Sequence, residues 1–209
     1  MLNSILGRKV GMTQLFTNDG KVVPVTVIDV ANWFVTQAKS VENDGYAAVQ
    51  LGLLKKKYRN HSFDNSWLKK KSIYFAFLRE VKVDNAVLQE FKIGQEIKLN
   101  NVDFNDKSIV RVTGRTKGKG FKGVVGRWHF SGGFATHGSM FHRRPGAIGS
   151  MRTQGEVIKG KKLPGHTGDR QITVKGLRVV CLDLQGGYLF VKGAVPGKKD
   201  SLITVSKQG

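Results

Sequence analysis

Cysteine is nearly absent from this sequence, since Cys181 is the only one among 209 residues. A single cysteine excludes a fold held together by disulfides. It lies in the apolar run 177–184, where we expect a buried core residue in a reducing compartment. Long apolar runs are also missing: none reaches transmembrane length, no basic amphipathic helix occurs, and the apolar part of residues 1–12 is too short for a secretory signal. The sequence therefore predicts a cytoplasmic protein with no membrane partner.

Negative charge is scarce as well. Asp and Glu number 15 against 35 Lys and Arg, which gives a formal net charge of +20 and a pI of about 10.2. Like charges at this density destabilise a compact state, and the usual reason to keep them is binding to phosphate. The length bounds the chain to one domain or two small ones, with enough apolar residues to bury a core.

The charge bias is strongest in residues 114–170. This segment contains only two acids, Glu156 and Asp169, and over most of its length it lacks both the alternation of a strand and the spacing of an amphipathic helix. It is too polar and too rich in glycine to build a core of its own. Loops of this length are rare in compact domains unless they are functional. We therefore predict an RNA-binding extension at 114–170.

The rest of the chain, residues 1–113 and 171–209, carries the signals of β-structure. Turn sequences at 18–20, 43–45 and 185–187 separate apolar runs, as in hairpins. The expected strands are residues 8–17, 21–30, 34–39, 46–53, 73–83, 94–99, 108–113, 172–174, 177–184, 188–192 and 202–205. Residues 55–71, with two lysine triplets, predict a surface segment with a short helix. The fold class is therefore predicted to be mainly β: a small closed β-barrel domain with a long, largely irregular basic extension inserted between barrel strands.

Two glycine-rich stretches of the extension approach known nucleotide-binding motifs. Residues 118–123 (GKGFKG) match G-x-G-x-x-G, but a dinucleotide site needs a βαβ unit and an acid about 20 residues further on, and the next acid is Glu156. Residues 155–162 approach a Walker A loop, except that Lys162 replaces its Ser or Thr. We interpret both as places where the backbone passes close to sugar-phosphate. For 155–162 a solvated loop is the alternative.

Catalytic and metal sites find no support in the sequence. His137 and His142 have no cysteine or carboxylate nearby to complete a zinc site. The sequence has no G-x-S-x-G motif, and no acid is placed to orient a histidine beside a serine of the extension. We therefore predict that the protein is not an enzyme and binds no cofactor and no metal.

Aromatic and basic residues alternate in the extension, as in Arg127-Trp128-His129-Phe130. This mixture is typical of base stacking and backbone contact in folded RNA. The alternative for Trp128 and Phe130 is that they anchor the root of the extension to the barrel. Residues 123–128 are expected to form one or two helical turns. The residues predicted to contact RNA are Arg115, Lys117, Lys119, Lys122, Arg127, Trp128, His129, His137, His142, Arg143, Arg144, Arg152, Lys159, Lys161, Lys162, His166 and Arg170.

Eight short strings follow one another along the chain: GRKVGMTQLF, PVTVIDV, GRTKGKGF, GRWHF, ATHG, HRRPGAIG, GKKLPGHTG and VKGAVPG. In this order and spacing they resemble the universal family of large ribosomal subunit protein three, in its bacterial form. The resemblance covers nearly the whole chain and is loosest over residues 53–83.

The resemblance implies a β-barrel on the outer face of the large subunit and a looped extension that penetrates the large ribosomal RNA. It implies a tip near the peptidyl transferase centre and a role early in subunit assembly. The tip would span residues 142–152, with Arg143, Arg144 and Arg152 against RNA. The other tip residues are Pro145, Gly146, Ala147, Ser150 and Met151. Some bacterial members carry a methylated glutamine at the position where this chain has Ser150.

The predicted function is a structural constituent of the large ribosomal subunit that binds its rRNA, nucleates assembly and supports the peptidyl transferase region. The expected partners are large-subunit rRNA and neighbouring ribosomal proteins, with no small-molecule substrate. A non-ribosomal RNA chaperone and an RNA-modifying factor are the alternatives. The expected location is the cytoplasmic ribosome, and the sequence does not distinguish a bacterial from an organellar source.

Overall fold

The computed structural model describes residues 2–17, 19–59, 61, 63–150 and 155–208. The chain divides into two compact units, and each is described by itself. The barrel unit comprises Met1–Arg115 and Gln171–Gly209, and the extension unit comprises Thr116–Arg170. The boundaries lie within two residues of those at which the composition changes in the sequence.

The barrel unit is built on six antiparallel strands that close on themselves. Their order around the barrel is β1-β12-β7-β10-β11-β2. The strands are β1 (Ser4–Phe16), β2 (Val22–Asp29), β7 (Ile109–Arg115), β10 (Gln171–Asp183), β11 (Tyr188–Lys192) and β12 (Leu202–Lys207). Closure gives each of the six strands a neighbour on both sides within the barrel, as the many short strands of the sequence predicted. The predicted fold class is confirmed.

Apolar side chains at every second position of the strands fill the interior of the barrel. Val110 and Val112 of β7 are fully buried, as are Ile203 and Val205 of β12, while the residues between them are half-buried or exposed. Successive side chains of a strand point to opposite faces, so every second residue reaches the core. Each buried aliphatic side chain of this size stabilises the fold by about 1.5–3 kcal/mol.

A second sheet lies in the same unit and was not predicted as a separate element. Its order is β5-β4-β3-β6, with β3 (Trp33–Lys39), β4 (Ala48–Leu54), β5 (Phe75–Lys82) and β6 (Glu96–Ile97). The predicted hairpin between the third and fourth strands is present, because β3 pairs with β4 in antiparallel register. Trp33 of β3 is fully buried in one core together with barrel residues such as Ile203. The sheet is therefore packed on the same hydrophobic core as the barrel.

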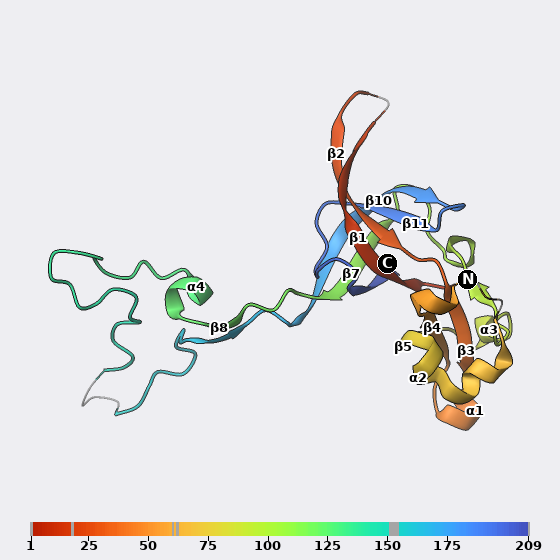
Figure 1. The fold of residues 1–209 in the computed structure, drawn as a ribbon, viewed down its shortest axis with the longest axis horizontal. Coiled ribbons are helices and arrows are strands. Elements are labelled where there is room, and N and C mark those ends of the chain that lie inside the picture. The colour runs from red at the N-terminus through yellow and green to blue at the C-terminus, as the bar shows by residue number, and fades with distance from the viewer. Residues whose placement is uncertain (1, 18, 60, 62, 151–154, 209) are drawn as a thin grey trace. The chain divides into compact units, whose positions relative to one another are not determined.

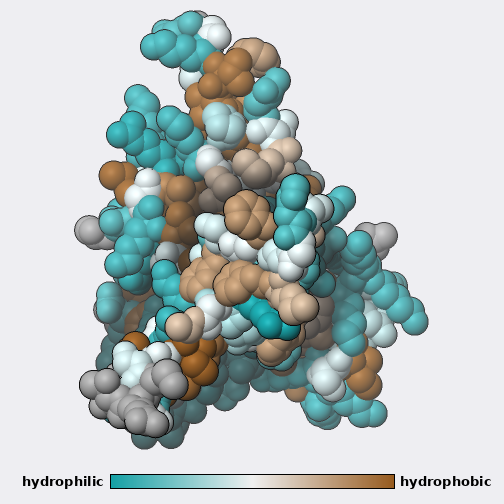
Figure 2. Space-filling model, turned by 90° about the vertical axis from the view of Figure 1, so that its left-hand side faces the viewer, coloured by the Kyte–Doolittle hydropathy of each residue, from teal (hydrophilic) through white to brown (hydrophobic). Residues whose placement is uncertain are grey.

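The β1–β2 hairpin extends beyond the barrel as a two-stranded ribbon (Figure 1). At the far end of the hairpin, residues 14–16 of β1 and 22–24 of β2 pair with each other and, among the described residues, with no further strand. Phe16 and Val22 in this part are exposed, as are Val10 and Met12 nearer the barrel. Figure 2 shows apolar surface, coloured brown, toward the top of the molecule, where the ribbon lies in Figure 1.

Residues 55–71 contain the predicted helical turns but are not only a surface segment. They form η1 (Lys56–Tyr58) and η2 (Asn65–Lys70), followed by α2 (Lys71–Tyr74). Trp67 is only 7% exposed and stacks on Tyr74 at 5.2 Å between ring centroids. With Leu54 and Phe75 it forms a second, smaller hydrophobic cluster. The sequence did not reveal this cluster, because the lysine triplets on either side of Trp67 suggested a segment wholly on the surface. The remaining helices are α1 (Val41–Asp44), α3 (Asn85–Leu88) and η3 (Leu99–Asn101).

The prediction that Cys181 is a buried core residue is wrong. Val179, two residues earlier in β10, is buried, and an unbroken strand would place Cys181 on the same face. The register of β10 against β11 shifts between the two residues, however, and Cys181 is exposed. A bulge of one residue turns the following side chain to the opposite face. Partial desolvation of the thiol, and then the charges of Asp106 and Asp183, raise the pKa of Cys181. The reactive thiolate form is therefore disfavoured.

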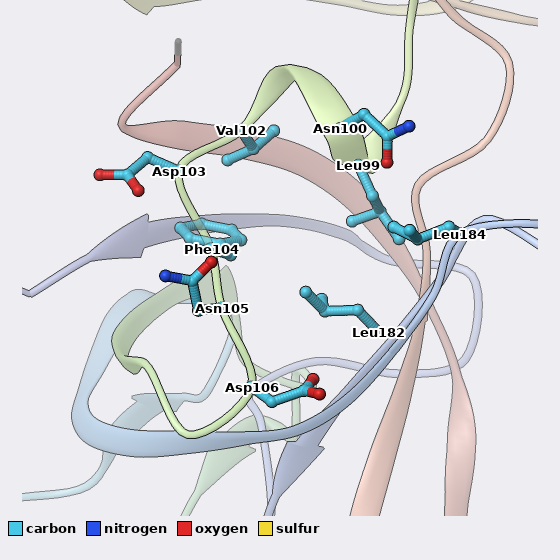
Figure 3. Close-up of a pocket in the computed structure, with 9 residues that line it drawn as sticks. All are labelled: Leu99, Asn100, Val102, Asp103, Phe104, Asn105, Asp106, Leu182 and Leu184. Atoms are coloured by element: carbon cyan, nitrogen blue, oxygen red, sulfur yellow. The ribbon is translucent and has the colours of Figure 1, made fainter.

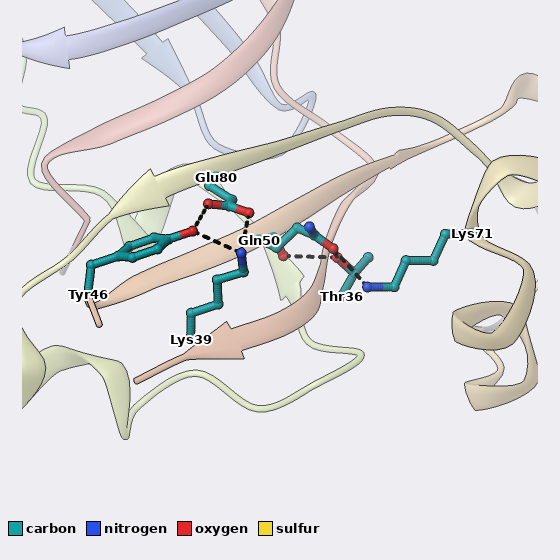
Figure 4. Close-up of polar contacts among 6 residues, drawn as sticks. All are labelled: Thr36, Lys39, Tyr46, Gln50, Lys71 and Glu80. Atoms are coloured by element: carbon teal, nitrogen blue, oxygen red, sulfur yellow. Dashed lines mark hydrogen bonds and ion pairs between the residues drawn. The ribbon is translucent and has the colours of Figure 1, made fainter. Parts of the chain in front are cut away.

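A polar network ties the outer side chains of the second sheet together (Figure 4). Lys39 Nζ lies 2.8 Å from Glu80 Oε1 and donates to Tyr46 Oη at 2.9 Å, and Tyr46 Oη donates to Glu80 Oε2 at 2.7 Å. The hydrogen bonds with Glu80 and then Tyr46 raise the pKa of Lys39, and the same bonds lower the pKa of Glu80. The charged forms of both residues are therefore favoured at neutral pH. The network links β3 to β5 across β4 and makes no catalytic arrangement.

Candidate nucleic-acid interface

The extension unit has almost no core. Among its described residues only Val124 is buried. This low burial agrees with the prediction from the sequence that the segment is too polar and too rich in glycine to build a core of its own. Its shape must therefore come from backbone hydrogen bonds and from a few close approaches between its two arms.

The extension unit has two arms, one that leads away from residue 116 and one that returns to residue 170. They are held together first at the neck, which consists of residues 116–122 and 165–170. Thr116 N donates to the Arg170 carbonyl at 2.9 Å, and Lys119 N donates to the Thr167 carbonyl at 2.9 Å. Strands β8 (Gly120–Lys122) and β9 (Gly165–Thr167) then pair in antiparallel register. The neck continues as a narrow ladder, and β8 is labelled along it in Figure 1.

Gly168 allows the arms to approach each other at this point. Its φ is +77°, and a Cβ atom placed on it would lie 2.1 Å from the carbonyl oxygen of Lys117. Both the backbone conformation and the available space therefore require glycine. The G-x-G-x-x-G stretch at 118–123 forms part of this neck and belongs to no βαβ unit.

A short helix organises the segment after the neck. Helix α4 (Val124–Trp128) begins after Gly123, as the sequence predicted. Arg127 Nη1 and Trp128 Nε1 both donate to the Leu163 carbonyl, at 2.7 and 2.9 Å. The Arg127 guanidinium lies 4.9 Å and the Lys162 ammonium 5.8 Å from the Trp128 ring centroid. Trp128 thus fixes Leu163 within the extension unit, a structural contact that the sequence analysis did not predict.

Beyond the helix the chain folds back once more. Gly133 N donates to the His142 carbonyl at 2.7 Å, and a Cβ on Gly132 would lie 2.7 Å from the same oxygen. His129, His137 and His142 have positive φ values of 60°, 57° and 44°. Histidine is among the residues that tolerate this region best, and all three lie at turns rather than around a common centre. Across the described part of the chain, no three His, Cys, Asp or Glu side chains gather in a group that could hold a metal ion.

Most of the predicted RNA-contacting side chains are exposed. Arg127 and Lys161 are half-buried, and Arg152 and Met151 lie outside the described residues. The extension unit carries eleven Lys and Arg against two acids, a net charge of +9. Two carboxylates cannot neutralise eleven cations, so most of this charge is available to a polyanion. The exposed predicted residues are Arg115, Lys117, Lys119, Lys122, Trp128, His129, His137, His142, Arg143, Arg144, Lys159, Lys162, His166 and Arg170.

The structure adds apolar candidates that the sequence did not single out. Phe121 is 67% exposed, Phe134 80% and Met140 81%. Phe121 stands between Gly120 and Lys122, Phe134 between Gly133 and Ala135, and Met140 between Ser139 and Phe141. An exposed aromatic in a segment without a core is a signal that could have been used, because such a ring has nothing of its own chain to pack against.

The barrel unit offers a pocket of a different kind (Figure 3). It has a volume of about 550 Å³, and its described lining includes Leu99, Leu182 and Leu184 together with Asp103 and Asp106. No Lys or Arg belongs to the described lining, and Asp103 is paired with Lys207. The pocket therefore does not suit a phosphate backbone. No helix in the described residues is both long and apolar enough to span a membrane.

Comparison with known proteins identifies the family. The model of the family described as "Ribosomal protein L3" matches residues 80–187, a stretch that includes the whole extension unit. The "Large ribosomal subunit protein uL3" of Alkaliphilus metalliredigens is 45% identical to this chain and covers 100% of both proteins. The chain belongs to the ribosomal protein L3 family.

Other relatives in the family agree over the full length. The uL3 protein of Syntrophotalea carbinolica is 44% identical over 99% of this chain and 98% of its own length. That of Oceanobacillus iheyensis is 43% identical over 99% and 97%. The ribosomal protein L3 family is a family of structural proteins and not of enzymes. The resemblance found in the sequence is confirmed in its bacterial form.

Proposed function

We propose that this protein is a structural constituent of the large ribosomal subunit that binds large-subunit rRNA mainly through residues 116–170. The observation that carries the proposal is the combination, in the extension unit, of a net charge of +9, exposed aromatic rings and a single buried side chain among the residues that the structure describes there. Such a segment gains stability only by packing on a dense polyanion.

Binding is then mostly electrostatic. Lys and Arg of the extension displace counterions from rRNA phosphates, so affinity falls steeply as salt rises. Base edges in helical RNA are hard to reach, and recognition depends on RNA shape, on stacking and on backbone contact. The barrel unit, with its own core, supplies the folded platform that carries the extension into the RNA.

An early role in assembly follows from the same physics. A basic segment without a core neutralises phosphates where rRNA helices approach one another, which favours the compact RNA fold. The tip at 142–152 is proposed to support the peptidyl transferase region. The RNA would provide the reacting groups, and Arg143 and Arg144 would hold its surroundings in place. Both side chains are exposed.

Changing Arg143 and Arg144 together to Ala tests the tip assignment. Subunits are expected to assemble at the normal level, because the rest of the extension and the barrel remain. The rate of peptide synthesis per subunit is expected to fall roughly two- to tenfold, since misplacement of supporting groups slows a positioned reaction. The measurement is translation by purified ribosomes, combined with the subunit profile on a sucrose gradient.

The matched control is the double change Arg143→Lys and Arg144→Lys. It keeps the charge but removes the planar fork that binds phosphate with two hydrogen bonds. An intermediate rate in this control indicates that geometry contributes beyond charge. Normal translation and a normal subunit profile in the double Ala variant would overturn the tip assignment while leaving rRNA binding by the extension intact.

A further inference from the structure

We propose that the neck of the extension binds one rRNA nucleotide turned out of its helical stack. The base would stack on Phe121, and its sugar-phosphate would lie in the glycine-lined pocket beside His166. This inference rests on the proposed rRNA binding and deepens it by naming the site and the kind of nucleotide it receives.

The aromatic platform is fixed in place before any ligand arrives. Phe121 lies in β8 directly opposite His166 of β9, and the two rings meet edge to face at 5.9 Å and 86°. The ladder holds the backbone on both sides, from the Lys119–Thr167 hydrogen bond to the pair Lys122 and Gly165. With 67% of Phe121 exposed, its ring is open to a partner. A base that stacks there buries apolar surface without reordering the protein.

A pocket adjoins this platform. It has a volume of about 450 Å³ and is lined by Gly118, Gly120 and residues 166–170. This volume is within the range of roughly 300–1,000 Å³ that is typical of small-ligand sites. The glycines leave the backbone open to close approach by a ligand. His166 belongs to both features, because it lines the pocket and touches the Phe121 ring.

The charges around the pocket favour a nucleotide over a bare phosphate. Lys117, Lys119 and Arg170 are exposed on the two arms of the neck and attract the phosphate. Asp169 also lines the pocket and would repel an isolated anion. A carboxylate has several lone pairs, so even with one bond made it accepts from a ribose 2′-hydroxyl or an amino group of a base. An apolar protein side chain would cover Phe121 but would leave the nearby cations without an anionic partner.

The test compares Phe121→Leu with the conservative control Phe121→Tyr in the full-length protein. Leu keeps an apolar side chain but loses the ring, whereas Tyr keeps the stacking face. Large subunits that contain each variant are purified, their content of this protein is measured, and 2′-hydroxyl acylation is mapped along the large rRNA. We expect one or two nucleotides to become about tenfold more reactive in the Leu variant only, a factor within the range of roughly five- to hundredfold that base stacking on an aromatic is worth.

An unchanged acylation map in Phe121→Leu subunits that contain the protein at full stoichiometry would overturn the proposal. Absence of the native protein from the subunits would instead contradict the proposed function. If the Leu variant fails to assemble, the native chain carrying Phe121→p-benzoylphenylalanine decides the question by photocrosslinking. A crosslink to a single rRNA nucleotide supports the site, and a crosslink to a protein, or none, overturns it.

Discussion

Replacing Thr116–Arg170 with a short Gly-Ser linker is expected to lower the affinity of the chain for large-subunit rRNA at least about 100-fold at physiological salt. The replacement removes eleven of the 35 Lys and Arg but only two of the 15 acids, so the net charge falls from +20 to +11. The slope of log affinity against log salt should become shallower in parallel, since fewer counterions are released. Filter binding to rRNA at several salt concentrations measures both quantities.

The barrel unit should survive this replacement. Every residue of its main core cluster lies outside 116–170. Arg115 and Gln171 are paired across β7 and β10, so a linker of hairpin length joins them without strain. The urea midpoint of the barrel is therefore expected to stay close to that of the native chain. A folded barrel that binds rRNA within threefold of the native affinity would show that the extension is not the main RNA-binding element.

A same-length variant separates charge from shape. Changing Lys117, Lys119 and Lys122 to Gln leaves every backbone hydrogen bond of the neck in place. If all three contact phosphate, the salt slope should fall by roughly two to three, while the affinity at low salt remains measurable. This result supports a direct electrostatic role for the neck.

Changing Gly168 to Ala is expected to open the neck of the extension. The new Cβ would lie 2.1 Å from the Lys117 carbonyl oxygen, and the positive φ of 77° adds strain. The backbone must shift, which weakens the hydrogen bond from Lys119 N to the Thr167 carbonyl. We expect hydrogen exchange of the Lys119 amide to accelerate about 100-fold, because local opening exposes it. Incorporation into subunits should fall, while the urea midpoint of the barrel stays unchanged.

Gly120→Ala is the matched control for this change. Gly120 also has a positive φ, of 66°, but no atom lies within 4 Å of the position of its Cβ. The alanine in Gly120→Ala therefore has the conformational cost of a positive φ, about 1–2 kcal/mol, but makes no clash. Equal exchange rates at Lys119 in the two variants would contradict the view that close backbone contact at Gly168 holds the neck together.

Local patterns in the sequence were enough to predict the hairpins and the extension. The Asp19-Gly20 turn and the Asp44-Gly45 pair, which ends helix α1, each lie between strands that do pair, because turn chemistry acts over neighbouring residues. Alternating apolar residues identified the strands but not the sheet to which each belongs. Pairing partners are far apart in the chain, so β3 to β6 form a second sheet that periodicity could not reveal. The bulge beside Cys181 was hidden for the same reason.

Within the interface, the charge could be predicted and the geometry could not. The basic residues stand in the sequence with only two acids among them, and this alone indicated a polyanion. The need for glycine at 168 depends on the carbonyl of Lys117, some fifty residues earlier, and becomes visible only when the two arms are placed together. The hydrogen bond from Trp128 to the Leu163 carbonyl likewise joins residues far apart in the sequence. Whether Phe121 is exposed also depends on the tertiary structure, which no local pattern contains.

Binding of rRNA through the extension is tested most directly by photocrosslinking of the native protein to rRNA in purified, salt-washed large subunits, followed by mass spectrometry of the crosslinked peptides. We expect the protein to be present in stoichiometric amount and most RNA-crosslinked peptides to fall within residues 116–170. Crosslinks confined to the barrel unit, or a protein that washes off the subunits in salt, would contradict it.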